Sequence, residues 1–281
     1  MKNSTELASQ QPPPRQWQLK RAAALALGVV ASVGLNSPAL AAADAAPVKS
    51  PSRVLLITGI DYPGHLWRQT APVLRAQLEK DPRLAVTVVE DPSFLDSAAL
   101  TNYATVVLHF QNWETPGPGP AARENLRRYV ERGGGLVLTH FACGAWYGEW
   151  PEFKNLAGRA WFGPNGGRQH DPHGSFTVHI CDANHPVTSG VKDFETTDEL
   201  YTCLEGDAPI QVLATAKSKV DGKDYPMAFV LNYGQGRVFH TPLGHDTRAF
   251  GVDGVGELLR RGTAWTAGLP AAVTAGAGSA H

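Results

Sequence analysis

Short, unbroken runs of apolar residues in the first half of this chain restrict its fold more than any other feature. RVLLIT (residues 53–58), ATVVLHF (104–110) and LVLT (136–139) show no alternation of polar and apolar positions. A strand of this kind is apolar on both faces, as expected in a parallel sheet that helices cover on either side. The sequence therefore predicts an α/β protein with a mostly parallel sheet between two layers of helices.

Two segments between these runs have the spacing of amphipathic helices. The first covers residues 65–80 and the second residues 121–135, where Gly133 is placed to end the helix. The predicted apolar faces are Trp67, Thr70, Leu74 and Leu78 in the first helix and Ala122, Leu126, Tyr129 and Val130 in the second.

The remaining segments complete the predicted order of elements. LAVTVVE (84–90) is rich in β-branched residues, which gives the first half the order β-α-β-β-α-β. The second half is richer in strands and closes with a helix at 255–268. Its strand-like segments are 175–181, 209–216, 226–233 and 236–241.

The first 43 residues have the three-part pattern of a secretory signal peptide. Basic residues precede the apolar run AAALALGVVASVGL (22–35), and Ala39-Leu40-Ala41 offers a cleavage site, so we expect cleavage near Ala41 to Ala43. The run is too short to cross a bilayer comfortably, although an uncleaved anchor is the alternative. Twin-arginine export uses two consecutive arginines, and this chain has Lys20-Arg21 at that place. The sequence therefore does not decide between twin-arginine export and the general secretory route. We expect a periplasmic or secreted protein that is not membrane-bound after cleavage.

These patterns divide the chain into four parts. After the signal peptide and the start of a linker (1–43), the linker continues through residues 44–52. One folded domain is predicted from 53 to 268, followed by a disordered tail at 269–281. A homo-oligomer is compatible with this organisation, and the sequence does not fix the oligomeric state.

Charge and cysteine content narrow the possible functions. The formal net charge is −1, which gives no electrostatic reason to expect binding to nucleic acid or to an anionic membrane. The three cysteines, Cys143, Cys181 and Cys203, allow at most one disulfide within the chain. A Cys181–Cys203 pair and free thiols are both compatible with the sequence.

Polar and aromatic side chains follow the predicted strands at the points where the strands end. In open α/β sheets, ligands bind beyond the carboxyl ends of the strands, so these residues are expected to meet at one rim. They are Asp61 and His65, Asn112 and Trp113, His140 and Trp146, and His245 and Asp246. Such convergence favours a functional site, whereas a single histidine at a strand end is more often structural.

Other histidines have simpler interpretations. His109 and His179, inside strands, are interpreted as structural, and His185 before Pro186 as a turn cap or a site residue.

Several longer motifs add a family resemblance. Between Arg53 and Gly268 the chain resembles the ThuA-like (trehalose utilisation) family. The resemblance implies a relationship to class I glutamine amidotransferases, a flavodoxin-like three-layer core, and a role in the metabolism of keto sugars or glycosides. The matching motifs occur in family order: GHLWRQTAPVL, GGGLVLTHFACGAW, WPEF, HDPHGSFTV, NHPVTSGV, TDELY, GRVFHTPLGHD and RRGTAW.

The motif GGGLVLTHFACGAW raises the question of which residue occupies the turn after its strand. In the related amidotransferases that turn carries the nucleophilic cysteine. Here the equivalent position is His140, and Cys143 is expected about one turn into a following helix. A cysteine-dependent amidase-like hydrolase using Cys143 is one alternative, and a packed structural thiol is the preferred interpretation.

The histidines are the preferred candidates for chemistry on a small-molecule sugar or glycoside. Imidazoles combined with a carboxylate suit Zn, Mn, Fe or Ni, and they equally suit metal-free acid–base catalysis. We expect a hydrolase, lyase or isomerase, with a non-catalytic sugar-binding module as the alternative. The predicted catalytic residues are His140, His245, Glu199 and His65; the predicted metal ligands are His140, His170, His173 and His245; and the predicted substrate contacts are Trp113, Asn112, Trp146, Asp61 and Asp246.

Overall fold

The structure is a computed structural model that describes residues 50–161 and 169–271. The predicted signal peptide, most of the linker and residues 272–281 of the predicted tail lie outside the described residues. Within the described ranges, no helix is both long and apolar enough to cross a membrane.

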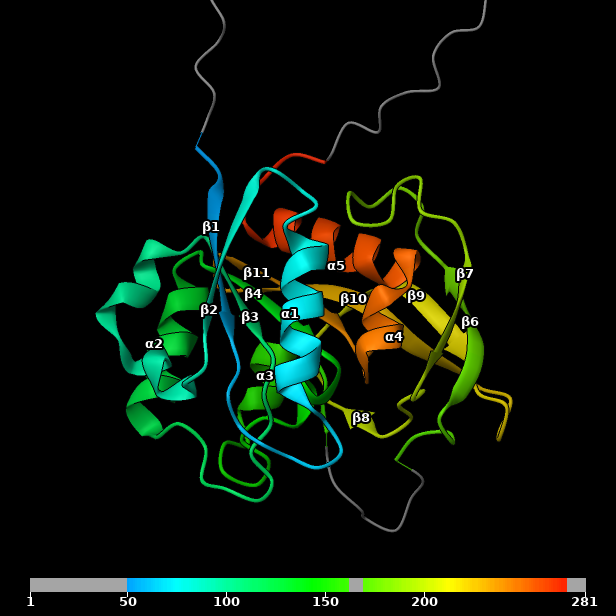
Figure 1. Cartoon of the computed structure of the whole chain (residues 1–281), viewed down its shortest axis with the longest axis horizontal. Coiled ribbons are helices and arrows are strands. Elements are labelled where there is room, and N and C mark those ends of the chain that lie inside the picture. The colour runs from blue at the N-terminus through cyan, green and yellow to red at the C-terminus, as the bar shows by residue number, and fades with distance from the viewer. Residues whose placement is uncertain (1–49, 162–168, 272–281) are drawn as a thin grey trace, which may run out of the picture. The chain divides into compact units, whose positions relative to one another are not determined.

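One sheet organises the described residues, and its strands have the order β2-β1-β3-β4-β11-β10-β9-β6-β7 (Figure 1). Pairing is parallel from β2 through β11 and antiparallel from β11 through β7. The strands are β1 (Ser52–Ile57), β2 (Leu84–Val89), β3 (Thr105–Leu108), β4 (Gly135–Thr139), β6 (Gly174–Ile180), β7 (Phe194–Asp198), β9 (Gln211–Lys217), β10 (Asp224–Tyr233) and β11 (Gly236–Thr241), and the short strands β5 (Ala160–Trp161) and β8 (Leu204–Glu205) pair separately.

Helices cover both faces of this sheet (Figure 1). On one face, α1 (Trp67–Leu78) and α5 (Asp253–Thr266) pack against each other and α4 (Thr247–Gly251). On the other lie α2 (Pro120–Glu131) and α3 (Phe153–Ala157). Successive residues of β1 enter different cores, since Leu56 packs with α1 and α5 while Leu55 packs with α2. This alternation explains why the strand is apolar without interruption.

The fold class predicted from the sequence is confirmed, as are the buried faces of α1 and α2. Two local details differ. His140–Gly144 forms a single 3-10 turn, η3, where a longer helix was expected. Strand β7 was not predicted, because its sequence FETTD has few of the apolar residues that mark a buried strand. Two further 3-10 turns, η1 (Pro92–Asp96) and η2 (Ala98–Asn102), link β2 to β3.

The close packing of α5 against the sheet can be tested at Gly262. A Cβ atom on Gly262 would lie 2.2 Å from the ring of Phe239 in β11. We expect Gly262→Ala to lower the free energy of unfolding by about 1–3 kcal/mol, because overpacking forces neighbouring atoms to shift. Gly251→Ala is the matched control, since nothing lies within 4 Å of its added Cβ. Urea denaturation measures both, and equal stability of the two variants would contradict the packing.

Candidate functional site

Two histidines meet because their strands are neighbours. Strand β4 pairs in parallel with β11, so their carboxyl ends lie together. His140 is the first residue after β4, and His245 follows β11 in the turn before α4. His245 Nδ1 lies 3.3 Å from His140 Nε2. The sequence-based prediction that these two side chains approach one another is confirmed.

The backbone of His140 is in a conformation that non-glycine residues rarely adopt. Its φ is 44°, in the left-handed region, which costs on the order of 1 kcal/mol and persists only where surrounding contacts hold it. His140 Nδ1 lies 2.8 Å from the carbonyl oxygen of Pro242. Because that oxygen only accepts hydrogen bonds, Nδ1 carries a hydrogen, and Nε2 faces the centre of the cluster.

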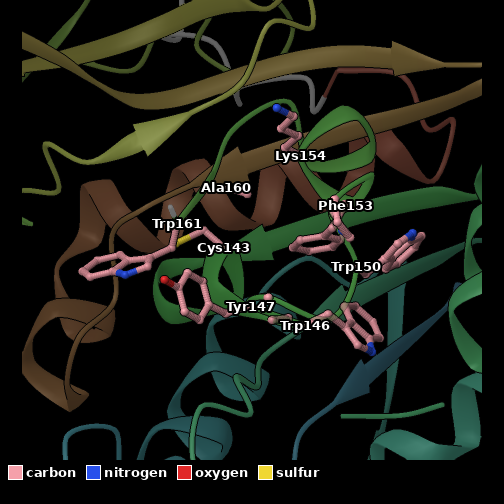
Figure 2. Close-up of a pocket in the computed structure, with 11 residues that line it drawn as sticks. Cys143, Trp146, Tyr147, Trp150, Phe153, Lys154, Ala160 and Trp161 are labelled. Carbon is pink, nitrogen blue, oxygen red and sulfur yellow. The ribbon is translucent and has the colours of Figure 1, made fainter. Parts of the chain in front are cut away.

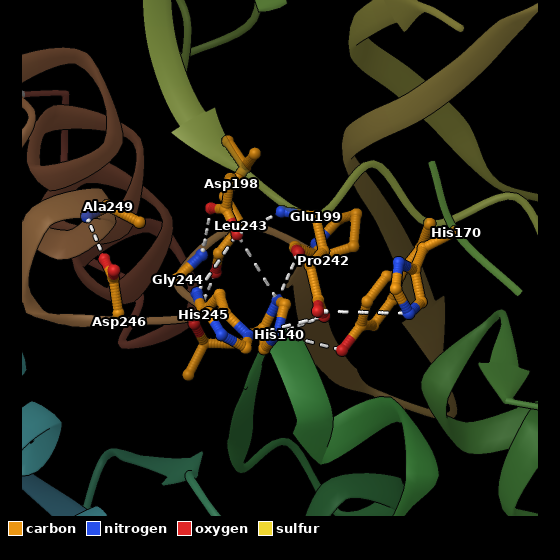
Figure 3. Close-up of polar contacts among 12 residues, drawn as sticks. His140, His170, Asp198, Glu199, Pro242, Leu243, Gly244, His245, Asp246 and Ala249 are labelled. Atoms are coloured by element: carbon orange, nitrogen blue, oxygen red, sulfur yellow. Dashed lines mark hydrogen bonds and ion pairs between the residues drawn. The ribbon is translucent and has the colours of Figure 1, made fainter. Parts of the chain in front are cut away.

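Asp198, the last residue of β7, ties three backbone positions of the site together (Figure 3). Its Oδ2 accepts a hydrogen bond from Gly244 N at 2.7 Å. Its Oδ1 accepts from His245 N at 3.2 Å and from Glu199 N at 2.8 Å. Complete burial raises the pKa of Asp198, although the field of His140 and these amides opposes the rise. This side chain therefore fixes the position of Glu199 relative to the turn after β11.

Glu199 contacts both central histidines. Its Oε2 lies 3.6 Å from His140 Nε2 and 3.3 Å from His245 Nδ1. Burial acts to raise the pKa of Glu199, but hydrogen bonds from the two histidines outweigh it and hold this pKa well below its usual value. The same contact raises the pKa of His245.

His65 reaches the cluster from the loop after β1. Its ring stacks on Phe141 and lies edge-on to His140 and His245, with centroids 5.0 and 5.3 Å away. Burial is the main cause that lowers the pKa of His65 to about 2, so its ring is neutral. The side chain is 6% exposed, and neither ring nitrogen has a hydrogen-bond partner. Buried polar atoms are almost always satisfied, so these two nitrogens point to a missing partner.

Four ligand atoms of this cluster could hold one metal ion. One atom each from His65, His140, Glu199 and His245 lies within 4.8 Å of all the others. Three neutral imidazoles and one carboxylate suit Zn, Mn, Fe or Ni. The unpartnered nitrogens of His65 and the inward-facing Nε2 of His140 fit such an ion. Together these four residues are called the His/Glu cluster below.

The predicted metal ligands and this cluster overlap in part. His140 and His245 belong to both sets, whereas His65 and Glu199 replace His170 and His173. The ring of His173 lies 5.2 Å from that of His245, and His170 Nε2 lies 3.9 Å from Glu199 Oε1. His170 and His173 therefore border the cluster, because the HDPH segment runs past it and does not enter it.

Three predicted substrate contacts have structural partners instead. Asn112 Oδ1 accepts from Trp146 N, and its Nδ2 donates to Glu149 Oε1, both at 2.6 Å. The buried Trp146 donates its indole N–H to Pro118 O. Asp246 caps α4 by accepting hydrogen bonds from the backbone N–H groups of Arg248 and Ala249. Their polar atoms are thus engaged in holding loops and a helix end.

The other two predicted contacts lie on the side of His65. Asp61 accepts a hydrogen bond from Trp67 and pairs with Arg68. A cavity of about 480 Å³ lies here, lined by Asp61, Tyr62, Pro63, His65, Leu66, Trp67, Arg68, Gln69 and Glu114. Trp113 packs edge-on against Tyr62, with ring centroids 5.5 Å apart. A cavity of this size that reaches a member of the His/Glu cluster can admit a small molecule.

Cys143 is 1% exposed and faces a second, aromatic cavity of about 230 Å³ (Figure 2). Burial raises the pKa of Cys143 well above its usual value, which disfavours the thiolate that a nucleophile requires. Cys181 and Cys203 are also free thiols, so the disulfide left open by the sequence is not formed. The geometry favours the packed structural interpretation of Cys143.

Tyr201 is a site residue that sequence reasoning missed. Its hydroxyl lies 2.9 Å from His140 Nε2, and its ring is buried against Trp161. Burial, and then the fields of neighbouring groups, raise the pKa of Tyr201 well above its usual value. Its place two residues after Glu199 in TDELY was visible, but nothing in the sequence directed the ring towards His140.

Three further histidines, His109, His179 and His185, have the contacts expected of structural residues. His109 is buried between the hydroxyls of Thr58 and Thr70, at 3.1 and 3.2 Å. His179 pairs with Asp193 on the surface. His185 Nδ1 accepts a hydrogen bond from Val187 N, as a turn cap does.

Comparison with known proteins gives a consistent result. The family model ThuA, described as trehalose utilisation, matches residues 53–266. A putative ThuA-like protein from Parabacteroides merdae is 28% identical, covers 79% of this chain and 92% of its own, and superposes with a TM-score of 0.68. A second, from Bacteroides uniformis, is 20% identical over 80% and 95% of the two chains, with a TM-score of 0.63. No curated protein matches the sequence.

The state of Cys143 can be tested by alkylation. In the folded protein we expect iodoacetamide to modify the exposed Cys181 and to spare Cys143, because a buried neutral thiol reacts slowly. Peptide mass spectrometry locates the modification, and Cys181 is the internal control. Cys143→Ala should cost about 1 kcal/mol of unfolding free energy. Rapid alkylation of Cys143 would instead support a reactive thiol.

Proposed function

The chain belongs to the ThuA (trehalose utilisation) family, and on that premise we propose that it is an enzyme acting on keto-sugar glycosides through a divalent metal ion in the His/Glu cluster. The single observation that carries this proposal is the state of His65. Two unpartnered nitrogens on a buried imidazole, within reach of three other ligand groups, are costly unless a ligand satisfies one of them. A metal ion supplies that partner.

The proposed chemistry is removal of a proton from the carbon next to a ketone. When bound, the metal would supply positive charge that polarises the carbonyl. His65, His140, His245 and Glu199 would hold it. His170 is the proposed base, because its Nδ1 donates to Asp171 O at 2.8 Å and leaves the lone pair of Nε2 on the side of Glu199.

Loss of that proton gives a route to cleavage of a glycoside. If the ketone is at C3, the base removes the proton on C2, and the electron pair forms a C1–C2 double bond as the bond from C1 to the glycosidic oxygen breaks. The departing oxygen takes up a proton. The reaction is an elimination, so the enzyme would be a lyase, one of the three classes (hydrolase, lyase or isomerase) considered from the sequence.

The cavity beside His65 is the proposed sugar site. Asp61, Arg68 and Glu114 offer charged groups for hydroxyls, and Tyr62 and Trp67 offer aromatic surface for the apolar face of a sugar ring. Its volume of about 480 Å³ falls in the usual range for small-molecule sites. Leu66, 52% exposed at this cavity, adds apolar surface that a ligand would cover.

We also propose that the protein acts after export. This rests on the sequence of residues 1–43 alone, with its basic start, apolar run and Ala39-Leu40-Ala41 site.

Metal binding is the first test. After treatment with a chelator, calorimetric titration with Zn²⁺, Mn²⁺, Co²⁺ or Ni²⁺ should show one site per chain. We expect His65→Ala to weaken binding at least about 100-fold, because it removes one of four ligands. His179→Ala, on the surface, is the control and should bind as the unaltered protein does. Equal affinity of His65→Ala and the control would exclude this ligand set.

Turnover is the second test. The probes are 4-nitrophenyl glucosides that are unoxidised, oxidised to a ketone at C3, or oxidised at C4. We expect release of 4-nitrophenol only from the C3 ketone, because only there does C2–H acidity lie next to the departing group. His140→Ala should abolish release. Binding of the C3 ketone without release by the metal-loaded protein would indicate a sugar-binding module.

A further inference from the structure

We propose that the hydroxyl of Tyr201 donates a hydrogen bond to the anionic oxygen that develops on a substrate in the His/Glu cluster. This inference rests on the proposed function, since it requires a metal ion on His140 Nε2. It adds a catalytic residue that the sequence did not suggest and that the metal-ligand set does not include.

The hydrogen-bond direction at His140 follows from its two partners. Nδ1 lies 2.8 Å from the Pro242 carbonyl oxygen and therefore carries the hydrogen. In the neutral imidazole that a metal ion requires, Nε2 then has the lone pair, and Tyr201, 2.9 Å away, is the donor. The hydroxyl hydrogen points into the His/Glu cluster.

A metal ion and Tyr201 cannot both use His140 Nε2. An imidazole nitrogen has one lone pair, and a metal ion bound there takes it. The hydroxyl then loses its acceptor while it remains buried, at 3% exposure of the residue. A buried donor without an acceptor is unfavourable, so an oxygen of a bound ligand at the metal is its natural new partner.

The surroundings of Tyr201 keep its hydroxyl in place. The ring packs edge-on against Trp161, with centroids 4.9 Å apart, and belongs to a buried cluster with Cys143. The backbone is fixed as well, because Tyr201 forms a bridge with His170 and Thr202 N donates to Gln169 O. The hydroxyl therefore stays close to His140 when its acceptor changes.

Acetohydroxamate provides a test that needs no knowledge of the natural substrate. Its carbonyl oxygen and its anionic N–O oxygen mimic the two neighbouring oxygens of the enediolate that forms when the hydroxyl-bearing carbon next to a ketone loses its proton, and it binds metal ions directly. With the Co²⁺-loaded protein, we expect Tyr201→Phe to weaken acetohydroxamate binding at least about 10-fold, the usual effect of removing a hydrogen bond to a charged group. Changes in the visible absorption of Co²⁺ measure the dissociation constant.

Tyr129→Phe is the matched control. Tyr129 is also buried and its hydroxyl also donates one hydrogen bond, to Tyr103 O, but it lies on α2. Tyr129→Phe should leave acetohydroxamate binding unchanged. Co²⁺ affinity should not fall in Tyr201→Phe, because the variant removes a competitor for His140 Nε2 and no ligand.

The outcomes separate the two proposals. If Co²⁺ binds to the unaltered protein and acetohydroxamate binds equally to Tyr201→Phe, the role of Tyr201 is wrong while the metal site stands. If Co²⁺ does not bind in the cluster, the proposed function fails and this inference fails with it. If Tyr201→Phe does not fold, Trp161→Leu is the second variant. It removes the ring that supports Tyr201, so we expect it to lose acetohydroxamate affinity, but less than Tyr201→Phe would. No loss in Trp161→Leu would overturn the proposal.

Discussion

The carboxylate of Asp198 is the contact on which the candidate site depends. It joins the end of β7 to the turn after β11, by accepting hydrogen bonds from Glu199, Gly244 and His245. These two strands lie at different places in the sheet, so without this contact little would hold Glu199 beside the histidines. A buried carboxylate is costly unless it is fully bonded, and three backbone donors offset part of that cost here.

The cluster itself is an unfavourable arrangement for a protein without a ligand. His140 has a left-handed backbone, and His65 is buried with both ring nitrogens unpartnered. Each feature reduces stability by on the order of 1 kcal/mol or more. Contacts elsewhere offset this, including the packing of Phe141 on His65 and the Pro242 carbonyl on His140. Strain of this kind is typical of positions where a ligand is bound.

The limits of sequence reasoning follow from the same geometry. Runs such as RVLLIT predict the parallel strands, and His140 and His245 could be paired because each follows a strand. The sequence did not show whether His65 or His170 belongs to the His/Glu cluster. Loop residues are positioned by contacts distant in sequence: His65 by Phe141, and Glu199 by Asp198, which itself depends on the turn after β11. Periodicity carries no information about such contacts.

His140 shows how this fold would support the proposed metal chemistry at the turn where the family resemblance places the nucleophile of the amidotransferases. A residue there is pushed out of the sheet by its left-handed backbone and faces the rim beyond the strands. A thiol in that position is useful because it attacks, whereas an imidazole is useful because one nitrogen can be fixed by a carbonyl and the other left open. Pro242 provides that carbonyl, and the nearest groups to the open nitrogen are Tyr201, His245 and Glu199. A histidine at this turn would therefore support metal chemistry only because the turn after β11 and the TDELY segment supply these partners.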